Sequence, residues 1–545
     1  MPRSPARTGS AIRRLRPILL GLIVLCAFVL RVTFNTYQLP PYWDYPNEID
    51  KMVDVLALEE LGFYHGYMQP SFLMNTMWLW YQPAQVVFPW VNATFPGFRP
   101  LEGGMEGWLL WLGRVYMALF GAATVWLVYF VGRRIGSARL GLTAALLLAV
   151  TPIHVLGSRH MKEDMPLAFF VTLALLFLLD VVRRGARRDY LRAGLAAGLA
   201  FSTKWIGISI LAPFLLAGLL AIPRTRRNWP APGRRWLIPL ILASFVAGFL
   251  LASPDYILAG RMNIIWEGPQ KGMTKAYDAH ADGIAVDAYR EAYVDYFRKG
   301  IWPGLTPALI LLAGIGFGSL WRRRRSAALL LGFWVVFFYI LIESARARPY
   351  PHFERYLQPI TPTLIVFAAC GVEAARRGAL RLLRQRRGFP PLRRAVAPAL
   401  LCLALAWPLA DTIRYLEHIP RSTVLQAREW IMQHVPPGAI IYDDSYGPGF
   451  PEGRYERRKY RSKDQLIVGA FPTEPCYVMY TSMGLGRFVE HPEANPGVAR
   501  WVFYVLSKGR LTKEWTPEFR SFYAESPLIK LYRFEPSPDP LVVEY

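Results

Sequence analysis

The chain of 545 residues has little of what several classes of protein require. It has only four cysteines, three inside apolar runs and one alone near the C-terminal end, so no disulfide framework or zinc spacing is available. It also shows no glycine-rich phosphate loop, no His/Cys metal motif and no internal repeat. These absences exclude the classes of protein that depend on those motifs.

Hydrophobic residues make up 53% of the chain, whereas only 19% of the residues are charged. Apolar runs long enough to cross a bilayer recur, which predicts a mainly α, polytopic membrane protein. The formal net charge is +24, but the arginines form short clusters between the apolar runs. That pattern is typical of cytoplasmic loops and not of a nucleic-acid groove, so we expect no nucleic-acid partner.

About eleven membrane-spanning helices are predicted. The basic start and first apolar run show no small-residue cleavage site, which predicts that the first span is retained. The run 190–223 is too long for one span, and Ser-Thr-Lys-Trp interrupts it, which predicts a pair of helices. The spans are expected near 16–35, 108–132, 139–156, 164–182, 190–203, 204–223, 236–254, 302–321, 326–343, 356–375 and 395–411.

The basic clusters all fall on the N-terminal side of these spans, which predicts a cytoplasmic N-terminus. The first outer loop, 36–107, agrees, because it has eight acidic residues against only Lys51 and Arg99. We therefore expect a transmembrane domain over 1–411 and an extracytoplasmic domain over 412–545. The other outer segments are 157–163, 255–301 and 344–355.

Two parts of the outer region have their own predicted structure. The apolar, aromatic stretch "SFLMNTMWLWYQPAQVVFPWV", broken by Pro83 and Pro89, predicts an interfacial helix along the outer leaflet. In the tail, "STVLQAREWIMQHV" predicts a helix that Pro-Pro-Gly ends, and "AIIYDD", "CYVMYTS", "WVFYVLS" and "PLIKLYRF" predict strands. The tail is therefore expected to be a small α/β or α+β domain.

Carboxylates gather on the predicted outer side. "PPYWDYPNEIDKMVD" places Asp44, Glu48 and further acids among aromatic residues just after the first span. "GSRHMKEDMPLAFF" places Arg159, Glu163 and Asp164 in one tight turn between two apolar helices. Helix starts rich in acidic residues, with Asp164 as a cap, are the simplest alternative. A catalytic cleft beside the membrane is the interpretation that accounts for so many charges.

Cations occur near the same side. Lys204 lies in the apolar run "GLAFSTKWIG", where an ammonium either reaches the interface or is held against a buried anion such as a lipid phosphate. Arg114 is near the outer end of its span, so it is predicted to extend to the interface. "ESARARPYPHFERYLQP" adds His352 and Arg355, and outer-side basic residues indicate an anionic partner.

Six segments in order, from the acidic first loop through "RVYMALFGAATVWLVYFVGRRIG", the Arg159–Asp164 turn, "STKW", "ASPDYILAG" and "HFERYLQPITP", resemble the GT-C glycosyltransferase superfamily. The resemblance covers roughly 15–375. It is closest to the bacterial phospholipid-carrier-dependent transferases related to protein O-mannosyltransferases and lipid A aminoarabinose transferases. It implies an inverting transfer of a sugar from a polyprenyl-phosphate donor to an outer-face acceptor, which could be a protein, a lipid or a glycan. It also implies that 1–411 is the catalytic domain and that the protein lies in a bacterial inner (plasma) membrane.

The resemblance also implies roles for particular residues. Relatives often have an Asp-Glu pair in the first loop, but here Asn47 stands at the Asp position, so Glu48, or Asp44 upstream, is the expected general base. Asp164 matches the second acidic site and, with Glu163, is expected to shape the acceptor or metal environment. The cations expected at the donor phosphate are Lys204, His352, Arg355 and Arg159.

Three questions stay open from the sequence. No ligand spacing decides whether a divalent metal ion takes part. A transporter or flippase for lipid-linked sugars would use similar charges, although it predicts charges near the bilayer midplane and paired repeats. Asn47 also leaves open a noncatalytic scaffold of the same fold.

Overall fold

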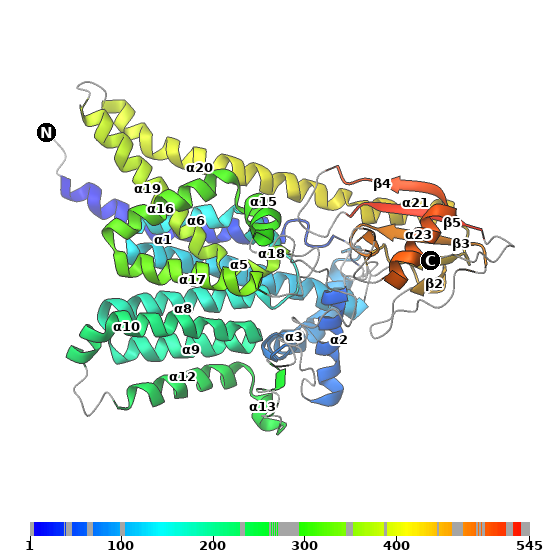
Figure 1. The fold of residues 1–545 in the computed structure, drawn as a ribbon, viewed down its shortest axis with the longest axis horizontal. Coiled ribbons are helices and arrows are strands. Elements are labelled where there is room, and N and C mark those ends of the chain that lie inside the picture. Colours follow the sequence, from blue (N-terminus) through cyan, green and yellow to red (C-terminus); the bar gives the residue numbers. More distant parts are fainter. Residues whose placement is uncertain are drawn as a thin grey trace.

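The computed structural model describes most of the chain as a helical bundle with a small sheet at one end (Figure 1). The described residues are 5–37, 39, 46–62, 69–98, 104–228, 235–260, 294–344, 353–385, 390–443, 446–459, 474–486, 496–518 and 527–535, with isolated positions 263, 265, 267, 268, 270, 472, 489 and 492 between them.

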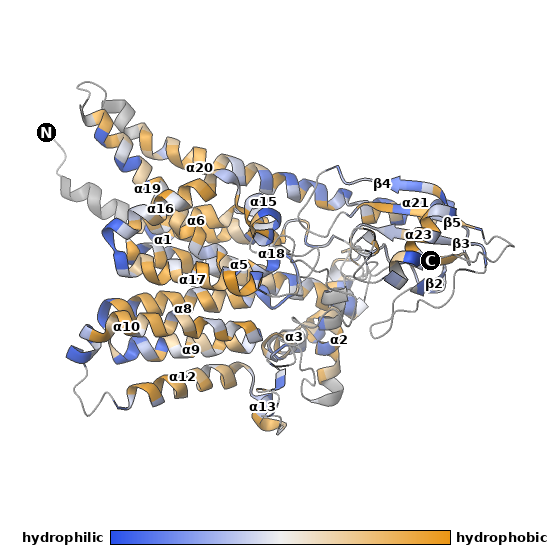
Figure 2. Ribbon diagram, in the orientation of Figure 1, coloured by the Kyte–Doolittle hydropathy of each residue, from blue (hydrophilic) through white to orange (hydrophobic). Residues whose placement is uncertain are grey.

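Long apolar helices build the bundle, and their hydrophobic residues form one continuous core (Figure 2). In order they are α1 (Pro5–Val32), α5 (Gly104–Ile135), α6 (Ala138–Ala149), α8 (Asp164–Arg184), α9 (Arg187–Thr203), α10 (Leu211–Asn228), α12 (Leu237–Ala252), α16 (Pro307–Arg323), α17 (Arg325–Glu343), α19 (Thr361–Gln385) and α20 (Pro390–His418). Short pieces join them: α7 (Pro152–Gly157), η1 (Trp205–Ile210), α13 (Asp255–Leu258), η3 (Phe297–Ile301), α15 (Trp302–Leu305) and α18 (Phe353–Tyr356).

Each of the eleven predicted spans overlaps a helix, but fewer helices are long enough to be spans on their own. Within the described residues, six helices have the length and apolar composition to cross a membrane, and a bent pair would make a seventh. The bend of 93° separates Phe297–Leu305 from α16, and Thr306 at the bend has a φ of +66° ahead of Pro307. The predicted pair over 190–223 is confirmed, because α9 ends at Thr203 and η1 and α10 follow.

Glycines allow two helix pairs to pack closely. A methyl group at Gly316 of α16 would overlap the Phe367 carbonyl oxygen of α19, and one at Gly198 of α9 would overlap the Phe245 carbonyl oxygen of α12. Small residues at such contacts let helix backbones approach, which is how helices associate in membranes.

The first outer loop contains two helices, α2 (Pro46–Leu61) and α3 (Phe72–Thr94). Both lie at the end of the bundle that faces the sheet, and the N-terminus lies at the other end (Figure 1). The predicted helix over the aromatic stretch is confirmed, but Pro83 and Pro89 do not break it. Its exposed Leu79, Val86 and Trp90 suit the outer-leaflet position, which stays a prediction.

The C-terminal region forms a five-stranded sheet between two helices. The strands are β1 (Ile440–Asp443), β2 (Glu456–Lys459), β3 (Cys476–Thr481), β4 (Arg510–Trp515) and β5 (Ile529–Phe534), in the order β2-β1-β3-β5-β4. β1 is parallel to β2 and β3, whereas β5 is antiparallel to β3 and β4.

One helix covers each face of this sheet. The helix α21 (Thr423–His434) shares a core with Ile441 and Met479, and α23 (Pro496–Lys508) shares another with Ile440 and Val478. Neighbouring strand residues point to opposite faces, so both faces are buried. The strand predicted for "WVFYVLS" is wrong, because this segment is part of α23. Its apolar residues Trp501, Val502 and Val505 bury one helical face, which a short apolar run does not reveal.

Candidate active site

The turn between α7 and α8 organises the candidate site. α7 ends at Gly157 and α8 begins at Asp164, and the side chains of residues 159 to 164 are all buried. The turn touches the first outer loop on one side and the end of α9 on the other. It lies at the end of the bundle where α2 and α3 are found (Figure 1).

Glu48, on the first turn of α2, is held from several directions. Arg114 of α5 binds it through both carboxylate oxygens, with Nη2 2.8 Å from Oε2 and Nε 3.3 Å from Oε1. The Met161 backbone N–H donates to Oε1 at 2.7 Å, and His160 Nδ1 lies 3.8 Å from the same oxygen. Arg114 also stacks 4.5 Å above the Tyr37 ring. The exposed fractions are 1% for Glu48 and 2% for Arg114.

These contacts determine the proton affinity of Glu48. Burial by itself would raise the pKa of Glu48, but the charges of Arg114 and His160 and the hydrogen bonds from Arg114 and Met161 outweigh it and lower the pKa to about 2. A carboxylate with so low a pKa takes up a proton poorly. The general-base role of Glu48 stays a prediction, and its contacts fit a residue that positions α2 against the turn.

A second group of charges surrounds Lys204, between α9 and η1. Its Nζ lies 2.7 Å from Asp164 Oδ1 and 4.5 Å from the centre of the Tyr356 ring. Arg355 lies beside the same ring, with its guanidinium 4.9 Å from the ring centre and Nη2 3.2 Å from the Tyr356 hydroxyl. Lys204 is 8% exposed and Asp164 4%. A buried carboxylate and a buried ammonium therefore lie next to a half-buried guanidinium.

Glu163 connects this group to the first outer loop. Its Oε1 lies 2.7 Å from Lys51 Nζ of α2. Burial would raise the pKa of Glu163, but the charges of Lys51 and Lys204 lower it below its usual range. The Glu48 group and the Lys204 group thus meet on the same turn.

The other predicted residues are placed as follows. Arg159 donates to the backbone carbonyls of Arg31 and Thr33 and lies 5.5 Å from the Tyr37 ring, so it faces the segment after α1. Asp44 and His352 lie outside the described residues. The donor-phosphate roles of Arg159 and His352, and the alternative base role of Asp44, stay predictions.

Glu163 and Asp164 are the carboxylates that the sequence offers to a divalent metal. Glu163 and Asp164 each face a lysine ammonium, and no group of three His, Cys, Asp or Glu side chains suited to a metal occurs in the part of the chain that the structure describes. The participation of a divalent metal therefore stays a prediction.

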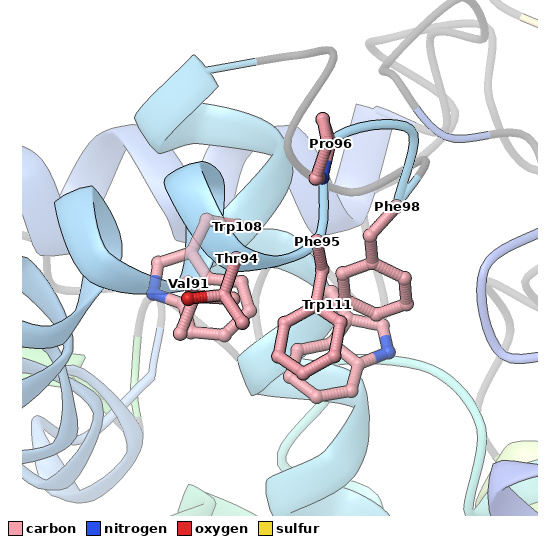
Figure 3. Close-up of a pocket in the computed structure, with 7 residues that line it drawn as sticks. All are labelled: Val91, Thr94, Phe95, Pro96, Phe98, Trp108 and Trp111. Atoms are coloured by element: carbon pink, nitrogen blue, oxygen red, sulfur yellow. The ribbon is translucent and has the colours of Figure 1, made fainter.

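An aromatic cavity of about 670 Å³ lies between the C-terminal end of α3 and the first turns of α5 (Figure 3). The rings of Trp108 and Trp111 stack with centroids 5.1 Å apart, and Phe95 and Phe98 lie beside Trp111, with the Phe98 ring edge-on to it at 5.3 Å. The described residues that line this cavity carry no charged side chain, so this part of its wall suits an apolar chain or a sugar face.

Several residues of the site were not identified from the sequence. Arg114 was predicted to extend to the interface, and this is wrong, because it is buried and paired with Glu48. Tyr356 was missed, although it follows Arg355 directly. Tyr37 and Lys51 were also not proposed as site residues. Glu48 and Arg114 are 66 positions apart in the sequence, so only the folded structure shows that they form a pair.

Comparison with known proteins relates this geometry to known families. Residues 105–252 match the model of the dolichyl-phosphate-mannose-protein mannosyltransferase family. A segment of 123 residues is 32% identical to YkcB of Bacillus subtilis (strain 168), which is provisionally named a mannosyltransferase. That segment is 22% of this chain and spans only 17% of YkcB.

Two solved structures share the fold over most of the chain. ArnT from Cupriavidus metallidurans bound to undecaprenyl phosphate has a TM-score of 0.51 and 15% identity, over 94% of this chain and 97% of ArnT. The oligosaccharyltransferase of Archaeoglobus fulgidus has a TM-score of 0.50 and 13% identity, over 89% of this chain and 71% of that protein. The family match covers residues 105–252, and the likeness to the two solved structures shows a shared fold over most of the chain.

Proposed function

We propose that the protein is a membrane glycosyltransferase that moves a sugar from a polyprenyl-phosphate donor to an acceptor on the extracytoplasmic face, with inversion at the anomeric carbon. The observation that carries the proposal is the buried Lys204–Asp164 pair together with the half-buried Tyr356 and Arg355 beside it. It combines what this reaction needs, namely cations for a phosphate and a carboxylate for a proton, within a GT-C fold. The ArnT structure contains undecaprenyl phosphate, which supports the donor class.

Each bond change has a candidate residue. The acceptor hydroxyl oxygen attacks the anomeric carbon while the bond from that carbon to the lipid phosphate oxygen breaks. The phosphate leaves with its electron pair, and Lys204 and Arg355 stabilise the developing charge. The acceptor proton passes to a carboxylate, for which we propose Asp164.

The contacts favour Asp164 over Glu48 as the base. Glu48 is bound by a bidentate arginine and a backbone N–H, which hold its pKa near 2. Asp164 instead pairs with the ammonium of Lys204. A donor phosphate that binds Lys204 would draw this ammonium away from Asp164. The carboxylate would then be available to the acceptor hydroxyl when the donor is in place.

The first test works whichever sugar is transferred. Envelope glycans from cells with and without the protein are compared by mass spectrometry, and the strain is complemented with wild type, Asp164→Asn or a control, Glu373→Gln, whose carboxylate pairs with Arg376 on α19. We expect one sugar modification to be lost without the protein and restored by wild type and the control but not by Asp164→Asn. Full restoration by Asp164→Asn would contradict its role.

A second measurement separates transfer from transport. The purified protein is placed in vesicles with a labelled polyprenyl-phosphate sugar made in the same cells, and label is followed on the acceptor fraction and across the bilayer. A transferase moves label to the acceptor. Movement of intact donor across the bilayer without transfer would overturn the proposal in favour of a flippase.

A further inference from the structure

A cavity of about 220 Å³ lies at the end of the bundle opposite the candidate active site. It is formed where α5, α8 and α10 end and where α16 passes into α17. Five arginines line it, which come from four separate parts of the sequence: Arg134, Arg183, Arg224, Arg324 and Arg325. These helix ends are hydrophilic in Figure 2, next to apolar helix bodies.

The arginines of the cavity differ from others at this end of the bundle in their partners. Arg184 is bound by Asp180 and Asp189, and Arg134 pairs with Asp180. The remaining four cavity arginines have no carboxylate within 4.0 Å among the residues that the structure describes. Arg324 donates to the Arg134 carbonyl at 3.1 Å, and Arg325 lies 5.0 Å from the Trp321 ring.

Like charges that converge on one cavity repel one another, and the repulsion is not screened fully at short range. The four arginines without a carboxylate partner are exposed, so their side chains can spread apart in part, but the helix ends hold their backbones around one cavity. An anion with several oxygens would offset this repulsion, and a phosphate group suits it because guanidinium groups bind its oxygens in pairs.

The apolar residues around the cavity indicate that a phosphate group bound there would belong to a lipid. Ile135, Leu179 and Val182 form an apolar part of the cavity wall. On α10, the turns that lead to Arg224 expose Leu215, Leu219 and Ile222 by 71%, 64% and 39%. A basic pocket between the ends of membrane helices, next to apolar surface, is the arrangement that binds anionic lipid head groups.

We propose that this cavity binds the phosphate head group of an anionic glycerophospholipid in the leaflet at that end of the bundle. With the predicted orientation this is the cytoplasmic leaflet. The bound head group would hold the ends of α5, α8, α10 and α17 together. The proposal does not rest on the glycosyltransferase function, because the cavity and the candidate active site lie at opposite ends of the helices.

The test compares two triple variants of equal charge. The cavity variant carries Arg183→Gln, Arg224→Gln and Arg325→Gln. The control carries Arg226→Gln, Arg227→Gln and Arg322→Gln, which lie on the last turns of α10 and α16 but do not line the cavity. Binding of dioleoylphosphatidylglycerol and dioleoylphosphatidylcholine to the detergent-purified full chain is measured by native mass spectrometry.

We expect the cavity variant to bind phosphatidylglycerol about a hundredfold more weakly than wild type, since each of the three lost guanidinium contacts to the phosphate contributes roughly a factor of five. The control should stay within about twofold of wild type, and phosphatidylcholine should bind weakly to all three proteins. Equal weakening in both variants, or none in the cavity variant, would overturn the site. A circular dichroism melt shows whether each variant is folded.

Inorganic pyrophosphate is added as a competitor to identify the source of the phosphate. If it displaces phosphatidylglycerol only at concentrations far above that of the lipid, the apolar surface contributes and the lipid assignment is supported. If pyrophosphate alone binds as tightly as the lipid, the cavity is a site for a soluble anion and the lipid assignment is overturned.

Discussion

Lys204 and Asp164 form a buried ion pair, with Nζ 2.7 Å from Oδ1, between the end of α9 and the first residue of α8. Each charge has its partner within the bundle, and the Tyr356 ring and Arg355 complete the group. If a donor phosphate replaces Asp164 as the partner of Lys204, substitutions at the two positions should have different effects on catalysis.

We therefore expect Asp164→Asn to lower kcat by about 10²- to 10⁴-fold, because the amide cannot accept the acceptor proton. Lys204→Ala should weaken binding of undecaprenyl phosphate, the product analogue, by about tenfold or more, because a charge-assisted contact to phosphate is lost. Lys299→Ala, an exposed lysine outside the group, is the control for the loss of an ammonium. Wild-type affinity in Lys204→Ala, measured by isothermal titration calorimetry, would contradict its phosphate role.

The Glu48–Arg114 pair should stabilise the fold. Removing one partner leaves a buried, unpaired charge, so Glu48→Gln and Arg114→Met should each lower the free energy of unfolding by about 3–5 kcal/mol. The double variant should lose less than the sum, because it leaves neither charge alone. Thermal unfolding in one detergent measures all three. Additive losses would show that the two side chains do not act as a pair.

The same pair predicts a pH dependence with a definite sign. The pKa of Glu48 is about 2 in the folded protein and 4.5 for an ordinary glutamate, so the unfolded chain binds a proton first as the pH falls. The stabilisation by Glu48 is complete above pH 4.5, declines as the pH falls toward 2 and is absent below. Because Glu163 also has a lowered pKa, the measurement is the difference in melting temperature between wild type and Glu48→Gln from pH 7 to pH 3. This difference should shrink at low pH; a constant difference would show that Glu48 does not titrate as proposed.

The sequence predicted the helical regions well, because apolar runs and basic clusters are properties of short segments. The prediction that the basic clusters share one side agrees with the cavity that unites Arg134, Arg183, Arg224 and Arg324. Fewer helices than the eleven predicted spans are long enough to cross a membrane alone, because helices such as α6 and α12 are apolar but have fewer than 18 residues. The tail helix at 496–508 was predicted as a strand for a similar reason, since its apolar residues form a run too short to show a helical period.

The sequence indicated individual residues of the candidate site but not the contacts between them. Asp164 and Lys204 were each unusual as charged residues beside apolar runs, so their types and surroundings indicated function. That they contact each other depends on how α8 packs against α9, and no local pattern states it. Arg114 was misassigned because its partner Glu48 lies on another helix.

Asp255 attaches the first outer loop to the bundle, and its removal should loosen α3. The carboxylate accepts hydrogen bonds from Ser71 Oγ at 2.6 Å and Asn75 Nδ2 at 2.7 Å, and it is buried. Asp255→Ala leaves both donors without this acceptor, so we expect a loss of about 2–3 kcal/mol in the free energy of unfolding and faster trypsin cleavage in the loop. Asp255→Asn keeps an acceptor oxygen and should lose less. Equal effects of Ala and Asn would show that the hydrogen bonds are not what matters.

The close packing of α16 against α19 gives a prediction with a control on the same helix. A methyl group at Gly316 would overlap the Phe367 carbonyl oxygen, so Gly316→Ala must push the helices apart and should destabilise the protein by about 1–3 kcal/mol. Gly318, two residues further along α16, has open space around its Cα, with no other heavy atom within 4 Å of an added methyl group. Gly318→Ala should therefore be neutral or stabilising by up to about 1 kcal/mol, because alanine favours the helix. Melting temperatures in the same detergent compare the two. If Gly316→Ala is as stable as Gly318→Ala, α16 and α19 are not in the close contact described.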